Sequence, residues 1–363
     1  MARAMSTPTG ATSLRRKYVF WSLLAASALG AVVWLGWAAK ATEQLTHRES
    51  LQCAIPAPAA NSPHPGRVWV PGGVLELGDT VYPEESPIRK VKLAGFWMDR
   101  TEVTNDDFAA FVLATGYKTV AERAVDPLLH PELPPEMRLP GAVVFISPNS
   151  LSGKGSPTQW WRYVPGANWR HPGGPDTDIA GRGTFPVVTV TVEDAHAYAQ
   201  WKGAVLPSEA QWEWAARGAS NTRIDEHAQP KAANTWQGLF PVVNSGEDGF
   251  VGLAPAACYT PNALGLFDMI GNAWELTRDA YTPSHDILAS EALPTPEQAR
   301  SKPLVKIPSQ AQAPVAQHVI KGGSFLCAPN YCMRYRAGSR QGQEDDLAVS
   351  HVGFRTVVMA PGP

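Results

Sequence analysis

Two cysteines stand close together near the C-terminus, in the stretch "SFLCAPNYCMRYR" of residues 324–336. Cys327 and Cys332 are separated by four residues, and the whole chain holds only four cysteines. A C-x4-C pair is compatible with a disulfide, with two unrelated buried thiols, or with a redox or metal-binding pair. No histidine or further cysteine stands at zinc-ligand spacing nearby, whereas two thiolates suit a soft, low-coordinate ion such as Cu(I). The spacing alone leaves all three interpretations open.

Three arginines follow the cysteines at once: Arg334, Arg336 and Arg340. Positive charge lowers the pKa of a thiol and favours the thiolate, which is both the nucleophile and the metal ligand. The alternative is that these arginines pair with the acids that come next, residues 344–346. Both interpretations are open from the local pattern.

Two further stretches place oxygen-bearing side chains among glycines. They are "NTWQGLFPVVNSGEDGFVG" at residues 234–252 and "LFDMIGNAWE" at residues 266–275. Oxygen ligands on a tightly turned backbone suit Ca²⁺, although neither stretch matches an EF-hand. Ordinary turns, in which Asn and Asp side chains bond to their own backbone, explain the same composition. His171 is a lone histidine, for which a structural role is the simpler interpretation, and hydrolase, kinase and zinc-protease motifs are missing from the sequence.

The composition indicates a folded chain with much loop. The 363 residues carry a formal net charge of -2, and 44% are hydrophobic, which permits a sizeable core. The charge balance gives no sign of a nucleic-acid partner. Four cysteines are too few to serve as a disulfide scaffold for this length.

The N-terminus has the pattern of a membrane anchor. Residues 1–17 are basic without an acid, and residues 18–39 carry no charge over a length that matches a membrane span. A cleaved signal peptide is the rival, because "AKA" at residues 39–41 fits a cleavage site. We therefore expect a membrane-anchored protein whose folded domain lies in the periplasm or outside the cell, secreted if the segment is cleaved. Residues 40–66 are Pro- and Ala-rich and are expected to form a linker before a domain at residues 67–363.

Short elements must position the candidate residues. Residues 68–79 predict a strand, a turn and a second strand, and residues 88–99 predict another strand. Capping pairs predict helices that begin after Thr104, Thr191 and Ser208 and end near Gly116, Gly203 and Gly218. Two strands are expected near the C-terminus, in "HVIKGGSFLC" and "HVGFRTVVM". Few regular elements without a βαβ rhythm favour a mixed α+β domain.

Taken together, these blocks resemble the formylglycine-generating enzyme family, also called sulfatase-modifying factors. The resemblance runs from Val68 to Val357 and includes "PGGVLELGD", "FWMDRTEVTNDDFAAFV", "GANWRHPGGPD", "PSEAQWEWAARG", "NTWQGLFPVVNSGEDGF" and "KGGSFLCAPNYCMRYR". It implies the sulfatase-modifying-factor fold, a compact, loop-rich α+β domain related to C-type lectin-like folds. Fold alone does not settle activity.

The resemblance implies a copper-dependent oxidase. Cys327 and Cys332 fall on the family's cysteine pair, which binds Cu(I) as a bis-thiolate. The implied substrate is an unfolded sulfatase segment with a Cys-x-Pro-x-Arg motif. Its cysteine is converted with O₂ to Cα-formylglycine, through loss of a hydrogen from Cβ and hydrolysis of a thioaldehyde. Ser324 joins the cysteines as a catalytic residue, and the substrate-binding residues are expected to be Trp274, Tyr331 and Arg334.

The resemblance also implies two structural Ca²⁺ sites. The first set of ligands is Asn234, Thr235, Asp248 and Phe250. The second is Asp268, Gly271, Ala273 and Glu275, where Asp268 replaces an Asn that is common in relatives. Residues 216, 337 and 356 lack the cysteines of the secreted animal enzymes, which indicates a bacterial type. Cys53 and Cys258 match no functional position, and His351 stands where the animal enzyme has Asn.

Two other functions remain open at this point. One is an exported relative that acts on a different substrate. The other is a non-catalytic lectin-like binding module at a membrane surface, in which Cys327 and Cys332 would form a permanent disulfide without copper. A monomer is expected in each case.

Overall fold

The computed structural model describes Cys53, Ala57 and residues 62–359, except 129, 132, 152–154, 224–229, 231 and 286–315. The chain divides into two compact units, Met1–Gln52 and Cys53–Pro363, of which the first lies outside the described residues. The described helices and strands all belong to the second unit.

The expected membrane-anchored localisation is corrected. Throughout the part of the chain that the structure describes, no helix is both long and apolar enough to cross a membrane. Residues 18–39, on which that prediction rested, lie outside the described residues. The anchor therefore plays no further part in the account.

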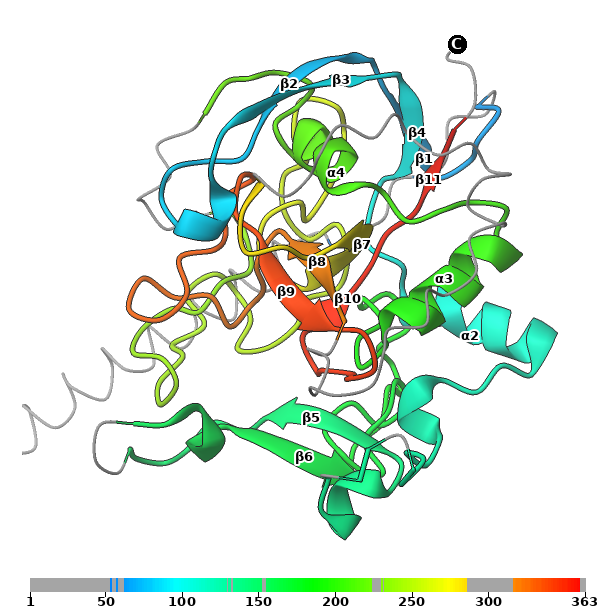
Figure 1. Cartoon of the computed structure of the whole chain (residues 1–363), viewed down its shortest axis with the longest axis vertical. Coiled ribbons are helices and arrows are strands. Elements are labelled where there is room, and N and C mark those ends of the chain that lie inside the picture. Colours follow the sequence, from blue (N-terminus) through cyan, green and yellow to red (C-terminus); the bar gives the residue numbers. More distant parts are fainter. Residues whose placement is uncertain are drawn as a thin grey trace, which may run out of the picture. The chain divides into compact units, whose positions relative to one another are not determined.

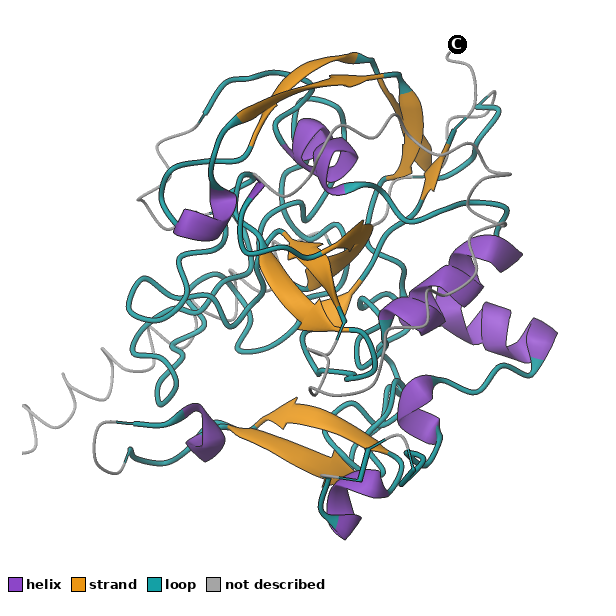
Figure 2. Cartoon of the chain, viewed as in Figure 1, coloured by secondary structure: helices purple, strands orange, loops and turns teal. Residues whose placement is uncertain are grey.

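The fold is loop-rich and mixes short helices with short strands, as predicted (Figures 1 and 2). The described strands form sheets in the orders β1-β4-β11, β10-β7-β8-β9, β2-β3 and β5-β6. Four 3₁₀ turns lie in the connections: η1 (Pro83–Glu85), η2 (Val120–Glu122), η3 (Pro135–Arg138) and η4 (Pro157–Gln159).

The N-terminal strands form one bent antiparallel ribbon. β1 (Arg67–Val70) pairs with β4 (Phe96–Asp99), and β2 (Gly73–Leu77) pairs with β3 (Arg89–Leu93) in the same continuing register. The single strand expected over residues 88–99 is thus interrupted at Ala94 and Gly95. A Cβ atom on Gly95 would lie 2.2 Å from the Trp69 ring, so the chain bends where only glycine fits. β11 (Val357–Val358) extends the β1–β4 sheet.

Among the described residues, three α-helices begin at the predicted capping residues. They are α2 (Asn105–Thr115), α3 (Val192–Trp201) and α4 (Glu209–Ala216). In each, the hydroxyl of Thr104, Thr191 or Ser208 accepts a hydrogen bond from the backbone N–H three residues later. The side chain of that later residue accepts a hydrogen bond from the backbone N–H of the capping residue. These reciprocal bonds satisfy amide groups that a helix N-terminus leaves free, which is why the start positions were predictable.

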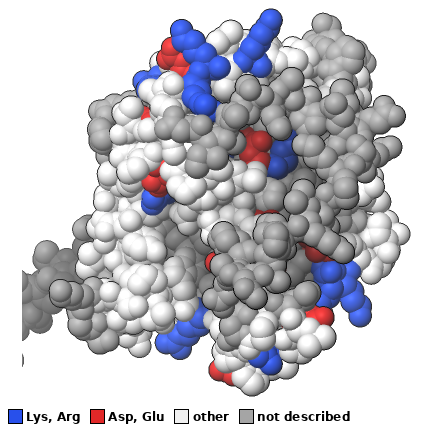
Figure 3. Space-filling model, in the orientation of Figure 1, with Lys and Arg blue, Asp and Glu red and all other residues white. Residues whose placement is uncertain are grey.

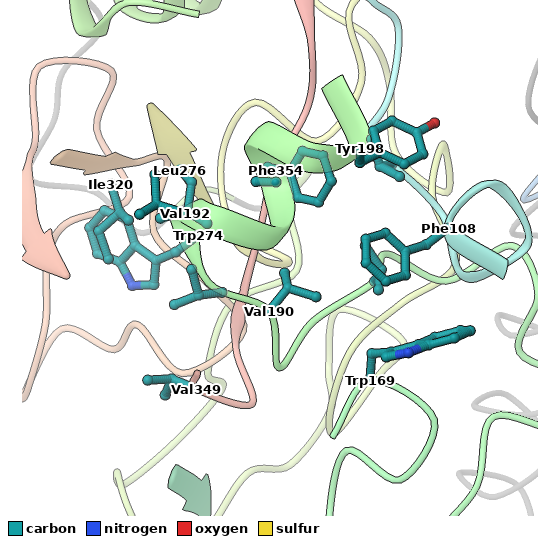
Figure 4. Close-up of a cluster of buried hydrophobic side chains, with 14 of the residues drawn as sticks. Phe108, Trp169, Val190, Val192, Tyr198, Trp274, Leu276, Ile320, Val349 and Phe354 are labelled. Atoms are coloured by element: carbon teal, nitrogen blue, oxygen red, sulfur yellow. The ribbon is translucent and has the colours of Figure 1, made fainter. Parts of the chain in front are cut away.

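The central sheet carries the core that holds the cysteines. It contains β7 (Trp274–Ala280), β8 (Gln317–Lys321), β9 (Gln341–Glu344) and β10 (Val352–Gly353). Figure 4 shows Trp274, Leu276 and Ile320 together at one end of the buried cluster, Phe108 and Tyr198 at the other, and Phe354 between them. Cys327 and Cys332 belong to this same cluster. The remaining hairpin, β5 (Gly141–Phe145) with β6 (Trp161–Pro165), contributes Val143 and Trp161 to its edge.

Candidate active site

Two glycines turn the chain from β8 into the cysteine loop. Gly322 and Gly323 have φ angles of 95° and 75°, which favour glycine. A Cβ atom on Gly323 would lie 2.8 Å from the carbonyl oxygen of Arg334. The "GG" before Ser324 is therefore required because the two ends of the loop pass each other at backbone contact.

Two short turns set the positions of the cysteines. The backbone N–H of Cys327 donates to the carbonyl of Ser324 at 2.9 Å, and the N–H of Leu326 donates to the Ser324 hydroxyl at 3.2 Å. The N–H of Cys332 donates to the carbonyl of Ala328 at 3.0 Å. The predicted catalytic Ser324 is fully buried and shapes the turn that presents Cys327.

The two thiols face each other without a bond. Their Sγ atoms lie 3.0 Å apart, and the exposed fractions of Cys327 and Cys332 are 1% and 7%. Both are free cysteines in this structure, because an S–S bond is about 2.05 Å long. The arrangement is a buried dithiol that can share one proton or clamp one soft ion.

The two thiols differ in acidity. Burial raises the pKa of Cys327 well above its ordinary value, and its hydrogen bond to Cys332 adds to the rise. The pKa of Cys332 falls to about 7, chiefly because its sulfur accepts that hydrogen bond, with help from the backbone, charge and side chain of Arg334. Above about pH 7 the pair therefore loses its first proton, and the remaining proton is shared between the two sulfurs.

The arginines after the cysteines meet acids from distant parts of the chain. Arg334 pairs with Glu84 at 2.5 Å, and its guanidinium lies 4.3 Å from the centroid of Tyr82. Arg336 pairs with Asp79 at 2.8 Å and also with Glu85, and Arg340 pairs with Glu209 at 2.8 Å. The acids that follow in sequence have other partners, because Asp345 pairs with His318 and Asp346 with His130. Of the three arginines, Arg334 is the one that acts on the Cys332 thiolate.

The ion pairs of Arg336 and Arg340 are internal. Figure 3 shows the charged side chains of one face scattered in small mixed groups among wide uncharged areas. Arg336, Arg340, Glu85 and Glu209 are instead almost fully buried. The charges fix the frame around the cysteine loop and contribute little to the outer surface.

Aromatic side chains form the wall beside the pair. Trp274 is buried in the same cluster as the cysteines. Tyr331 is 44% exposed and stacks on Phe240 with ring centroids 4.0 Å apart. The side chain of Asn330 bonds to both the N–H and the carbonyl of Phe240. Phe240, which the sequence analysis missed, thus anchors the segment between the two cysteines.

His351 lies against this wall as a neutral ring. Its centroid lies 4.8 Å from that of Trp161, and its Nδ1 atom has no hydrogen-bond partner. Burial lowers the pKa of His351 to about 3. It is therefore an uncharged group at neutral pH, in the place where animal relatives were expected to carry Asn.

The first predicted cation loop has one free buried oxygen. Asn234 uses its amide nitrogen on Gly252 and Asn272, and its Oδ1 atom has no partner. Asp248 accepts from the N–H groups of Thr235 and Phe250, and burial raises its pKa. An unpaired buried oxygen beside a carboxylate under desolvation fits the ligand chemistry of Ca²⁺.

The second predicted loop differs in detail from the expected set. Glu275 gives both carboxylate oxygens to Arg355, at 2.6 Å each, and also accepts from the indole of Trp212. Oδ1 of Asp268 and Oε2 of the buried Glu102 have no donor from any other group, and the two carboxyl groups interact with each other. Burial raises the pKa of Asp268 to about 6 and that of Glu102 well above its ordinary value, each increased by other carboxylates nearby. Asp268 and Glu102 offer the free oxygens here, and Glu102 was missed because it precedes the loop by more than 160 residues.

The predicted cation sites are not built on carboxylates alone. Within the described ranges, no three His, Cys, Asp or Glu side chains are grouped so as to hold a metal ion. Ligation at either loop would therefore combine one or two carboxylates with amide and backbone oxygens, as the expected ligand sets do.

A disulfide joins Cys53 to Cys258 across 205 residues. Cys258 stands between Ala257, whose N–H donates to Asp268 at 2.7 Å, and Tyr259, whose hydroxyl donates to the carbonyl of Asp248 at 3.0 Å. The bond therefore fastens Cys53 to the segment between the two predicted cation loops.

The comparisons with known proteins agree with this architecture. Residues 52–360 match the model of the family described as "Sulfatase-modifying factor enzyme 1-like domain", and the chain belongs to that family. It is 46% identical over 296 residues to the formylglycine-generating enzyme of Mycobacterium tuberculosis, covering 80% of this chain and 96% of that one. It is 37% identical over 331 residues to the enzyme of the same name from Bos taurus, covering 87% and 82%.

Not every relative is named as active. A protein from Mus musculus named "Inactive C-alpha-formylglycine-generating enzyme 2" is 32% identical over 314 residues, covering 82% of this chain and 87% of its own. Among solved structures, PvdO from Pseudomonas aeruginosa has a TM-score of 0.52 at 20% identity, covering 80% of this chain and 93% of that one. That likeness concerns the fold alone.

Proposed function

We propose that this protein is a formylglycine-generating oxidase. It would convert the cysteine of a Cys-x-Pro-x-Arg motif, in a sulfatase chain that has not yet folded, to Cα-formylglycine with O₂. The observation that carries this proposal is the buried pair of free thiols, 3.0 Å apart, in a chain whose relatives bear that activity in their names.

Each residue of the cysteine loop has its own role in this proposal. Ser324 holds the turn before Cys327, and the pair keeps one thiolate at neutral pH because Cys327 donates its proton toward Cys332. Arg334 stabilises that thiolate and is itself held by Glu84. Tyr331, exposed and stacked on Phe240, offers a surface for the substrate chain, and Trp274 excludes water from the sulfurs.

The thiol pair fits Cu(I). Two buried free sulfurs that face each other, one of them with a lowered pKa, are the kind of donor set that a soft monovalent ion prefers, and they would move apart to hold it. Bound copper would supply the one-electron chemistry that O₂ requires and that no side chain of the pair provides. Turning –CH₂–SH into –CHO with release of H₂S consumes one O₂, two electrons and two protons and yields one water, so a thiol reductant belongs in the assay.

Ca²⁺ has a structural role in this proposal. Asn234 and Asp248 would hold one ion with the carbonyls of Thr235 and Phe250. Asp268, with the carbonyls of Gly271 and Ala273, would hold a second, and Glu102 would take the part first given to Glu275, since Arg355 occupies that carboxylate.

A non-catalytic binding module is the second candidate, favoured by the relative named as inactive. The expected relation to C-type lectin-like folds remains a prediction and is the basis for such a role. That candidate requires a permanent Cys327–Cys332 disulfide, whereas both thiols are free in this structure.

The test uses the reduced full chain loaded with Cu(I). It is incubated in air with a reductant and a peptide that contains Cys-x-Pro-x-Arg, and the peptide mass is followed. The proposal expects loss of the mass that separates –CH₂–SH from –CHO, together with an aldehyde-specific label. An unchanged peptide with copper bound would contradict this substrate, and Cys332→Ser is the negative control.

A further inference from the structure

One buried asparagine lies where both predicted cation loops meet the cysteine loop. Asn272 is fully buried and uses its whole amide group. Its Oδ1 accepts from the N–H of Ala254 at 2.9 Å and from Nδ2 of Asn234 at 3.0 Å. Its Nδ2 donates to Oε1 of Glu102 at 2.9 Å and to the carbonyl of Ala254 at 3.3 Å. The side chain therefore touches Asn234 of the first predicted cation site and Glu102, the carboxylate that the structure adds to the second.

The backbone of the same residue reaches the cysteine loop. The N–H of Phe325 donates to the carbonyl of Asn272 at 2.9 Å, and the N–H of Gly271 donates to the carbonyl of Gly322 at 2.9 Å. The N–H of Asn272 donates to the carbonyl of Asn234 at 2.9 Å. Residues 271–272 are thus fastened to Gly322 and Phe325, which precede Cys327 by five and two residues.

The conformation of Asn272 makes this arrangement specific. Its φ angle is 55°, in the left-handed region that Asn tolerates better than most residues. A Cβ atom on the preceding Gly271 would lie 2.3 Å from the carbonyl oxygen of Asn234, so the loops are at backbone contact. The Asn272 side chain makes its four hydrogen bonds from this left-handed backbone conformation.

The oxygens without a hydrogen-bond partner belong to two side chains that are themselves hydrogen-bonded to Asn272. Asn234 turns its amide nitrogen to Asn272, which leaves its Oδ1 unpaired, and Glu102 gives Oε1 to Asn272, which leaves its Oε2 unpaired. An ion that binds these free oxygens fixes both side chains. Because the side chains of Asn234 and Glu102 both bond to Asn272, an ion that fixes them also restrains Asn272. The backbone of Asn272 in turn holds Phe325 and the turn that precedes Cys327.

We propose that Asn272 is a positioning residue that couples occupancy of the cation loops to the metal affinity of the Cys327–Cys332 pair. The identities of the ions rest on the proposed function, but the coupling is a property of the hydrogen bonds around Asn272. Because coupling between two sites is reciprocal, Ca²⁺ strengthens Cu(I) binding by the same factor by which Cu(I) strengthens Ca²⁺ binding.

The decisive variant is Asn272→Gly. Glycine takes a φ of 55° without strain, so the backbone bonds to Asn234 and Phe325 persist while the amide group is lost. The matched control is Asn262→Ala. The Asn262 side chain also makes four hydrogen bonds, to residues 215, 216, 264 and 266, none of them a predicted ligand.

The measurement is competition for Cu(I) between the reduced full chain and a chromophoric chelator, with Ca²⁺ or with a calcium chelator present. The wild type and Asn262→Ala are expected to bind Cu(I) about 10-fold more tightly with Ca²⁺. In Asn272→Gly that ratio falls towards one, although thermal unfolding shows a folded protein. Calorimetric titration with Ca²⁺, with and without Cu(I), gives the reciprocal ratio.

An equal ratio in Asn272→Gly and the wild type, or a wild-type ratio of one, would overturn the proposal. If the wild type does not bind Cu(I) at all, the copper function fails on its own. The coupling is then read from the alkylation rate of the two thiols with and without Ca²⁺. A calcium effect that Asn272→Gly removes supports the inference even then, and an effect that it retains contradicts it.

Discussion

The sulfur atoms of Cys327 and Cys332 lie 3.0 Å apart in the core, hydrogen-bonded and without a covalent bond. Burial holds the proton on Cys327, while Cys332 accepts its hydrogen bond and faces Arg334. A permanent disulfide would remove this asymmetry. The pair is arranged as one thiol and one thiolate, which a soft ion can convert to two thiolates by displacing one proton.

Alkylation should report this asymmetry. Because the pKa of Cys332 is lowered to about 7, the thiolate is present above that pH and lost below it. In the metal-free protein, the rate of Cys332 alkylation should rise through pH 7 and level off. In Cys327→Ala the hydrogen-bond donor is gone, so the rise should move to higher pH. The check is a pH series with mass-resolved labelling, and an unchanged midpoint in Cys327→Ala would contradict the shared proton.

Arg336 should be essential for stability. It pairs with Asp79 and Glu85, and its replacement by Ala leaves these carboxylates buried without their cation. Loss of one partner from a buried ion pair costs about 3–5 kcal/mol in the free energy of unfolding. Urea denaturation measures it.

The control for that experiment is Arg123→Ala. Arg123 pairs with Glu193 at 2.7 Å, but the two side chains are 43% and 59% exposed. An exposed pair contributes about 0–1 kcal/mol, so this variant should unfold almost as the wild type does. Equal losses in the free energy of unfolding for the two variants would show that the buried ion pairs of Arg336 contribute no more to stability than an exposed pair.

Asp268→Asn should have opposite effects with and without Ca²⁺. Burial and the neighbouring carboxylates raise the folded-state pKa of Asp268 to about 6, so its ionised form destabilises the ion-free protein above that pH. This destabilisation is lost as the pH falls below 6 toward the unfolded pKa of about 3.9.

With a calcium chelator at pH 7.5, Asp268→Asn should therefore be more stable than the wild type, and the difference should vanish near pH 4. With Ca²⁺ it should bind the ion more weakly, because one ligand charge is lost. Thermal unfolding over a pH series and calorimetry provide both numbers. If Asp268→Asn is less stable than the wild type under all conditions, the charge of Asp268 does not destabilise the ion-free protein.

The Cys53–Cys258 disulfide should stabilise the domain strongly. It closes a loop of 205 residues, and removal of a native disulfide typically costs about 2–5 kcal/mol. Cys53→Ala with Cys258→Ala should lower the free energy of unfolding by that amount and leave Cys327 and Cys332 titratable as free thiols. If stability is unchanged, the bond does not brace the segment between the cation loops.

Local sequence rules predicted the starts of the described helices well. Thr104, Thr191 and Ser208 begin helices because the acceptor and donor of each capping box are only three residues apart. The strand expected over residues 88–99 failed at Gly95, because the close approach of Trp69 belongs to the other side of the ribbon. Contacts of that kind leave no trace in local periodicity.

The surroundings of the site depended on long-range contacts that no spacing rule gives. The acids that bind Arg334 and Arg336 are at positions 79–85, about 250 residues earlier. Glu102 and Asn272 were missed as site residues for the same reason, although "GNAWE" holds Asn272 in the middle of a predicted ligand stretch. The partner of Cys53 was equally hidden, because cysteine spacing does not reveal connectivity.

The central claim is that Cys327 and Cys332 together form a metal-binding dithiol. X-ray absorption at the copper edge of the reduced full chain, loaded with one equivalent of Cu(I), tests it most directly. The account predicts one copper per chain with two sulfur ligands, and loss of that signal in both Cys327→Ser and Cys332→Ser. Copper that stays bound with the same spectrum in either variant, or a reduced wild type that takes up no copper, would contradict it.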